Sequence, residues 1–148
     1  MTKLSNLVFI LTALLLTYSC DSLSKEEEAF DKKMQEIIDV HDEVMPKMGE
    51  MSALIKNLES KIDTTNATRN YKQAQQNLKD GYDFMMEWMS DFSQKFPHDD
   101  KNKELSNEEL NVKMKILEQE EVEVKELRDQ INSSIQNAKS VLKITEEE

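Results

Sequence analysis

The stretch FDKKMQEIIDVHDEVMPKMGEMSALIKNLESKI, residues 30–62, decides the fold of this chain. Its apolar positions recur every three or four residues without a slip, and a histidine takes one of them. They are Phe30, Met34, Ile37, His41, Val44, Met48, Met51, Ile55, Leu58 and Ile62. Such spacing is typical of a coiled-coil-like helix. We expect one helix over about residues 25–63, started by the capping box of Ser24 and Glu27 and kinked at Pro46, which lacks a backbone donor.

Two further seams of the same kind follow. The first predicts a helix over about 66–95, before Pro97, and runs through Ala67, Tyr71, Ala74, Leu78, Tyr82, Met85, either Trp88 or Met89, and Phe92. The second runs through Leu110, Met114, Leu117, Val124, Leu127, Ile131, Ile135, Ala138 and Leu142 and predicts a helix over about 107–145. Ser106 and Glu109 form its capping box. Short links make sequential helices antiparallel, so the expected fold is all-α, an antiparallel three-helix bundle forming one domain over residues 25–148.

The first nineteen residues are expected to be a lipoprotein signal peptide. Lys3 precedes an apolar run of about ten residues, 7–16, which is too short to span a bilayer and has the length typical of a signal peptide. The run is followed by Cys20, the only cysteine, which cannot form an internal disulfide. We expect Cys20 to be lipidated, with residues 20–24 as a tether to the bundle. A plain signal peptide with an incidental cysteine is the alternative.

Charge narrows the choice of partners. Without Lys3, the chain from Cys20 onward carries 18 basic and 30 acidic side chains, a net charge of −12. This charge repels phosphate backbones and anionic headgroups, so nucleic acid is not an expected partner and the lipid on Cys20 must hold the protein at the membrane. The predicted location is the bacterial cell envelope, on the outer membrane and facing either the periplasm or the cell surface.

A cluster of soft ligands stands out in HDEVMPKMGEM, residues 41–51. If the first hairpin turns near residues 64 and 65, position 41 lies opposite position 88, which brings His41 and Met45 against Met85, Trp88 and Met89. Folding the third helix back about residues 100 and 101 would bring Met114 to the same level.

This cluster has three interpretations. Methionine is a flexible filler, so these residues can be ordinary core around a kink. Thioether sulfur and imidazole nitrogen also suit copper(I), and that site would use His41, Met45, Met48, Met85, Met89 and Trp88. A third interpretation is an exposed methionine-rich groove for a partner helix.

Catalytic motifs are missing from the sequence. It contains no nucleophile elbow, no phosphate-cradling glycine loop and no CxxC pair. The carboxylates of Glu118, Glu120 and Glu121 are expected to belong to a solvated helix face. We therefore expect no enzyme activity and no cofactor, with copper(I) as the alternative.

Cys20, HDEVMPKMGEM and YDFMMEWMSDF (residues 82–92) together give the chain a recognisable pattern. It resembles a group of small acidic helical lipoproteins of Bacteroidetes-type bacteria, often labelled "viral A-type inclusion protein". That group has no assigned activity, so the resemblance implies a location and a helical fold only. The expected function is a structural or protein-interaction module of the envelope, with an envelope protein as partner and a homodimer as a further option. Copper(I) binding or handling is the alternative function.

Overall fold

The computed structural model describes residues 24–62, 68–98 and 105–144, and within them the chain is helical. The helices are α2 (Lys25–Val44), α3 (Lys47–Lys61), α4 (Thr68–Lys95) and α5 (Asn107–Ile144). α2 and α3 are the two halves of the predicted first helix, so the all-α three-helix bundle with a bend at Pro46 is confirmed. The predicted signal peptide, Cys20 and most of its tether lie outside the described residues.

Both predicted capping boxes form. The Ser24 amide donates to Glu27 Oε2 at 2.7 Å, and the Glu27 amide donates back to Ser24 Oγ at 3.2 Å. Ser106 and Glu109 repeat the exchange at 2.9 and 3.3 Å. Each pair satisfies backbone donors that the first turn of a helix leaves unpaired, and this fixes where α2 and α5 begin.

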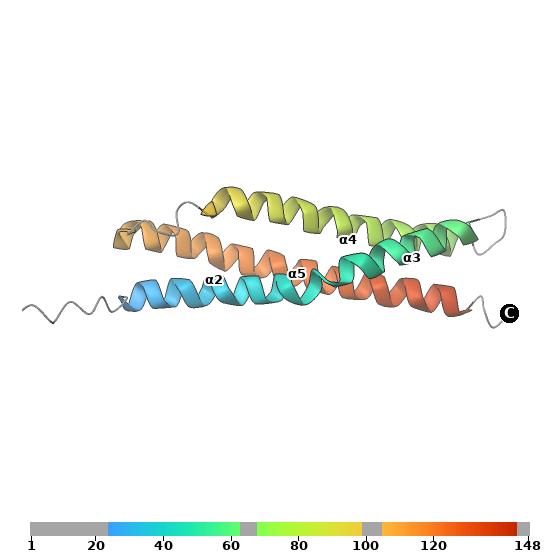
Figure 1. The fold of residues 1–148 in the computed structure, drawn as a ribbon, viewed down its shortest axis with the longest axis horizontal. Coiled ribbons are helices and arrows are strands. Elements are labelled where there is room, and N and C mark those ends of the chain that lie inside the picture. The colour runs from blue at the N-terminus through green and yellow to red at the C-terminus, as the bar shows by residue number, and fades with distance from the viewer. Residues whose placement is uncertain (1–23, 63–67, 99–104, 145–148) are drawn as a thin grey trace, which may run out of the picture.

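The elbow at residues 45 and 46 changes the direction of the chain between α2 and α3, which together form the first arm of the bundle. Met45 and Pro46 keep right-handed helical dihedrals, and the Met45 amide still donates to the His41 carbonyl at 2.9 Å. The break arises because Pro46 has no amide hydrogen for the carbonyl of Asp42. α2 lies along α5, whereas α3 crosses onto α4 while keeping contact with α5 (Figure 1).

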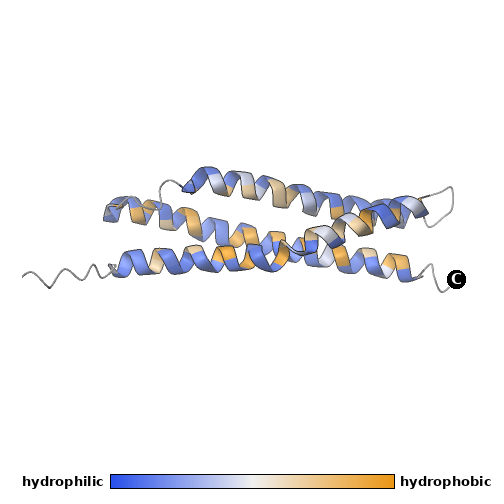
Figure 2. Cartoon of the chain, viewed as in Figure 1, coloured by the Kyte–Doolittle hydropathy of each residue, from blue (hydrophilic) through white to orange (hydrophobic). Residues whose placement is uncertain are grey.

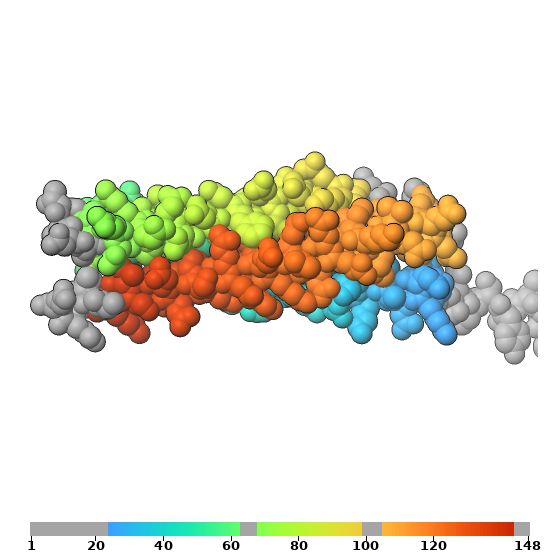
Figure 3. Space-filling view, turned by 180° about the vertical axis from the view of Figure 1, so that it is seen from behind, coloured from blue at the N-terminus to red at the C-terminus, as the bar shows by residue number. Residues whose placement is uncertain are grey.

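One apolar stripe from each helix meets in a continuous core (Figure 2). In the first arm, every seventh residue is fully buried: Ile37, Val44, Met51 and Leu58. α4 contributes Ala74, Leu78 and Met85, and α5 contributes Leu117, Val124, Leu127, Ile131 and Ala138, all without exposed surface. A fully buried side chain of the larger kinds contributes about 1.5–3 kcal/mol, so the seam read from the sequence supplies the main stabilisation of an elongated body (Figure 3).

The predicted register between the first arm and α4 is correct. Gln75 donates to the Ile55 carbonyl at 3.2 Å, and His41 meets Trp88. Further along, a Cβ added at Gly81 would lie 3.2 Å from Met51 Cε.

The predicted register between α4 and α5 is wrong. Lys95 pairs with Glu120, and Gly81 faces Ile131, so α5 begins beyond the end of α4 (Figure 1). Trp88 and Met114 therefore lie on opposite sides of the Lys95–Glu120 pair, about 20 Å apart along the axis at 1.5 Å per residue. Met114 does not join the cluster around His41.

Candidate functional site

His41 and Trp88 form the contact around which the candidate site is built. His41 lies near the end of α2 and Trp88 in the second half of α4. Their rings stack with centroids 5.7 Å apart and planes inclined by 28°. Trp88 is almost fully buried, whereas the His41 side chain keeps 20% of its surface exposed. The structure thus brings together the imidazole and the indole that the sequence placed opposite each other.

The two nitrogens of His41 have different surroundings. Nδ1 lies 2.9 Å from Asp42 Oδ1, and since an ionised carboxylate only accepts, Nδ1 carries the proton. Nε2 is buried and has no hydrogen-bond partner among the described residues. Trp88 Nε1 is in the same condition. Buried polar atoms without partners are rare in native proteins and call for an explanation.

The methionines expected near His41 are spread from core to surface. Met85 is fully buried, and Met48 and Met89 are half-buried against the core. Met45 is 44% exposed and its neighbour in level, Met86, is 50% exposed. The four methionines predicted as copper(I) ligands are therefore one core residue, two at the boundary of the core and one at the surface.

A ladder of aromatic rings extends from this contact toward the end of α4. Trp88 stacks on Phe92 at 4.9 Å, and Phe92 contacts Phe96 at 5.1 Å. Phe96 meets Phe30 of α2 at 6.3 Å, and Lys113 Nζ lies 5.5 Å from the Phe96 centroid. α2 and α4 thus meet chiefly through rings, while the close backbone neighbour of α2 is α5. Aromatic pairs at such distances add about 0.5–1.5 kcal/mol each beyond burial.

Glu120 is the functional candidate that the sequence reading missed. It was expected in solvent, yet its side chain is 1% exposed. Glu120 Oε1 accepts from Lys95 Nζ at 2.7 Å, while Oε2 has no partner among the described residues. That hydrogen bond is the main cause of a raised pKa at Lys95. A signal existed, because Glu120 fills the seam position between Leu117 and Val124.

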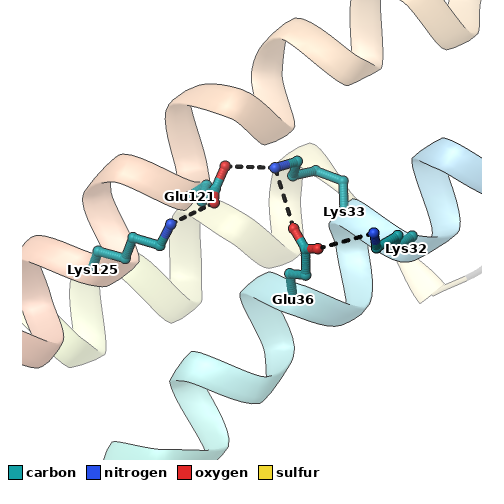
Figure 4. Close-up of polar contacts among 5 residues, drawn as sticks. All are labelled: Lys32, Lys33, Glu36, Glu121 and Lys125. Atoms are coloured by element: carbon teal, nitrogen blue, oxygen red, sulfur yellow. Dashed lines mark hydrogen bonds and ion pairs between the residues drawn. The ribbon is translucent and has the colours of Figure 1, made fainter.

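A second charged group ties α2 to α5 at the surface (Figure 4). Lys33 Nζ lies 2.7 Å from Glu121 Oε2 and 3.2 Å from Glu36 Oε2, and Lys125 also pairs with Glu121. Hydrogen bonds from Lys125 and then Lys33 hold the pKa of Glu121 below its ordinary value. Glu121 in turn raises the pKa of Lys33. Glu121 is half-buried and paired with two lysines. It was expected on a solvated helix face together with Glu118 and Glu120, so that expectation is wrong for Glu121 as well as for Glu120.

Two shallow grooves mark the surface of the described bundle. One of about 360 Å³ lies between α4 and α5 and is polar. Its lining is Asn77, Asp80, Gln130, Ser133, Ser134 and Asn137. The other lies between α3 and α4, with Tyr82 and Ile55 among charged neighbours. Neither groove includes His41 or Trp88.

Within residues 24–62, 68–98 and 105–144, no three His, Cys, Asp or Glu side chains converge as metal ligands. None of the described helices has the length and apolarity needed to cross a membrane. No family model, curated protein or solved structure matches the chain.

Proposed function

We propose that this chain is a lipid-anchored envelope protein whose helical rod serves as a structural or protein-interaction module. The observation that carries the proposal is the start of α2. Ser24 caps the helix only four residues after Cys20. Four residues span at most about 14 Å, so an acyl chain on Cys20 would hold this end of the rod close to the bilayer.

The rod extends away from the proposed anchor. α2 and α5 both begin at the anchored end, where α4 finishes (Figure 1). α5 alone has 38 residues, or about 57 Å at 1.5 Å per residue. A body of this shape offers long side faces, and the two grooves described on it are open to solvent, which suits contact with another protein better than chemistry on a small molecule.

The exposed thioethers of Met45 and Met86 supply the favoured contact. Met45 follows His41 by one turn and Met86 precedes Trp88 by two residues, so in antiparallel helices the two lie at nearly the same level. Methionine adapts to varied apolar partners. The net charge of −12 on the chain from Cys20 onward (18 basic and 30 acidic side chains) favours a partner that surrounds its apolar surface with basic residues. We take the partner to be an envelope protein of that kind.

The anchor is tested by Cys20→Ala in cells given a labelled fatty acid. The unmodified chain is expected to carry the label and to fractionate with membranes, whereas the variant carries no label and leaves them. Equal labelling and fractionation of the two chains would refute lipidation at Cys20. Protease treatment of intact cells then distinguishes periplasmic from surface orientation.

The interaction role is tested with a photoreactive amino acid placed at Met45 or Met86 in the full chain. Val112 and Val122, 60% and 56% exposed on α5, are the matched controls. A discrete crosslinked species from the methionine positions alone, weakened by salt, supports the proposal. A species of twice the chain mass would identify a homodimer instead. Equal crosslinking from all four positions would contradict a defined contact surface.

A further inference from the structure

The surroundings of His41 match those of a metal ligand, a feature that does not depend on the proposed interaction role, although both proposals use Met45. A histidine that binds a metal through one ring nitrogen usually donates its other N–H to a carboxylate or carbonyl, which fixes the tautomer and the ring orientation. Asp42 does this at Nδ1, at 2.9 Å. The lone pair is thereby left on Nε2, which is buried and without a partner among the described residues.

We propose that His41 Nε2 is the nitrogen ligand of a binding site for a soft monovalent cation of the copper(I) class, completed by thioether sulfurs of Met45, Met48 and Met89. Imidazole nitrogen and thioether sulfur are the ligand types that such a cation prefers. Hard cations require several oxygen ligands such as carboxylates, and no three His, Cys, Asp or Glu side chains converge among the described residues.

Helix geometry places two of the thioethers on the face that carries His41. Met45 and Met48 follow His41 by four and seven residues, the spacing at which side chains share one helix face. Met45 keeps this place because its amide still donates to the His41 carbonyl at 2.9 Å, while Met48 lies just beyond the elbow in the first turn of α3, where its amide bonds to the Met45 carbonyl at 3.2 Å.

The third thioether comes from α4. Met89 follows Trp88 directly, so its backbone lies within about 1.5 Å of the level at which the indole stacks on His41. Met89 is half-buried, as is Met48. Met85, in contrast, is fully buried against the core, and we assign it to packing rather than to the site.

Exposure provides a route for the cation. Met45 is 44% exposed and flexible, so it can take up a cation at the surface and deliver it to the buried nitrogen. The net charge of −12 on the chain from Cys20 onward (18 basic and 30 acidic side chains) concentrates cations around the rod. Trp88 covers the inner side of the imidazole, where an indole face adds attraction for a cation.

The test uses the full chain in non-ionic detergent with Cys20→Ser, because a free thiol would itself bind copper(I). Copper(I) is titrated under reducing conditions against a coloured chelator, and silver(I) serves as a redox-inert second probe. Trp88 is the only tryptophan, so its fluorescence reports binding next to His41. The expected result is one equivalent bound with quenching of that fluorescence.

Two variants test the roles of the imidazole and its orienting carboxylate. His41→Gln is expected to abolish quenching. Asp42→Asn is expected to weaken binding by about 10–100-fold, the usual effect of losing such a partner. The Asp42 side chain is 67% exposed, so this change leaves the fold intact and its result can be interpreted even if a change at His41 disturbs packing.

Matched methionine variants complete the design. Met45→Leu, Met48→Leu and Met89→Leu together are expected to reduce affinity at least tenfold. Met34→Leu with Met114→Leu makes the same conservative change outside the site and is expected to leave affinity unchanged. The proposal is overturned if the chain retains no metal, if binding survives His41→Gln, or if the control pair weakens binding as much as the triple variant.

Discussion

His41 on α2 and Trp88 on α4 lie ring against ring, with centroids 5.7 Å apart, and each has a buried nitrogen with no hydrogen-bond partner in the described part of the chain. Two uncompensated nitrogens in one contact are a cost to stability, since desolvating an unpaired donor or acceptor costs about 1–3 kcal/mol. A core selected for stability alone would place an apolar side chain at position 41.

Replacing His41 by leucine should therefore stabilise the metal-free protein by about 1 kcal/mol, because the buried Nε2 disappears while the volume is largely kept. His41→Ala removes the ring contact with Trp88 as well and should lower the free energy of unfolding. Urea unfolding of both variants measures the difference. Equal destabilisation by leucine and alanine would show that the imidazole contributes favourably to the core.

Lys95 and Glu120 form an ion pair whose carboxylate is buried, so removing either partner alone should lower the free energy of unfolding. Lys95→Met keeps the aliphatic stem but leaves the Glu120 carboxylate without its donor, and we expect a loss of about 2 kcal/mol. Adding Glu120→Leu should recover most of it, because an apolar pair replaces a buried ion pair at little cost. A double-mutant cycle by urea unfolding checks this. Additive losses would contradict coupling between the two side chains.

The same pair should lose strength at high pH. The pKa of Lys95 is raised in the folded state by the hydrogen bond to Glu120. The pair therefore stabilises the fold fully below the ordinary lysine pKa of about 10.4, and the contribution disappears as pH rises through the higher folded value. Unfolding curves above pH 10, compared with those of Lys95→Met, should converge. A constant difference between the two proteins would contradict this assignment.

Glu121 should set part of the acid sensitivity. Its pKa is lowered by Lys125 and Lys33 (Figure 4), so its contribution is present above the ordinary glutamate pKa and is lost as pH falls through the lower folded value. Glu121→Gln should cost about 1 kcal/mol at pH 7 and flatten the decline in stability below pH 5. The exposed Glu118 provides the control for the loss of one surface carboxylate, since Glu118→Gln should leave the stability at pH 7 nearly unchanged.

The two glycines in the helices should respond differently to alanine. At Gly49 an added Cβ would meet nothing within 4 Å, so Gly49→Ala should stabilise by about 0.5–1 kcal/mol through backbone entropy. At Gly81 the Cβ would meet Met51 Cε at 3.2 Å and Ile131 Cγ1 at 3.6 Å. The methionine methyl must move, which offsets the gain. Thermal unfolding compares the two, and a larger gain at Gly81 would contradict the close packing there.

The bend and the first hairpin could be predicted because they depend on local chemistry. Pro46 removes one donor wherever it stands in a helix. The register of His41 against Trp88 follows from counting back from the short link between two antiparallel helices, although only α3 packs closely along α4. Residues at the seam positions of the first arm are buried or half-buried as the spacing indicates, with Leu54 an addition.

The second register could not be predicted by counting from the middle of the link. α5 extends past the end of α4, so the two helices do not begin and end at the same level (Figure 1). The pairing is set by Lys95 with Glu120 and by the close approach at Gly81, and both depend on three-dimensional packing. The burial of Glu120 could not be predicted either, because its charge favours an exposed position whereas its place in the seam favours a buried one.

Because of the elbow, the two ends of the rod should differ in how well they resist a pulling force. α2 leans mainly on α5, whereas α3 is wedged against α4 and α5 together. A pull applied at Ser24, the end nearest the proposed lipid anchor, would unfold α2 turn by turn and would then reach α3, which packs on both α4 and α5. Tension would therefore unfold α2 first and leave the distal half of the molecule folded, where it would resist further extension.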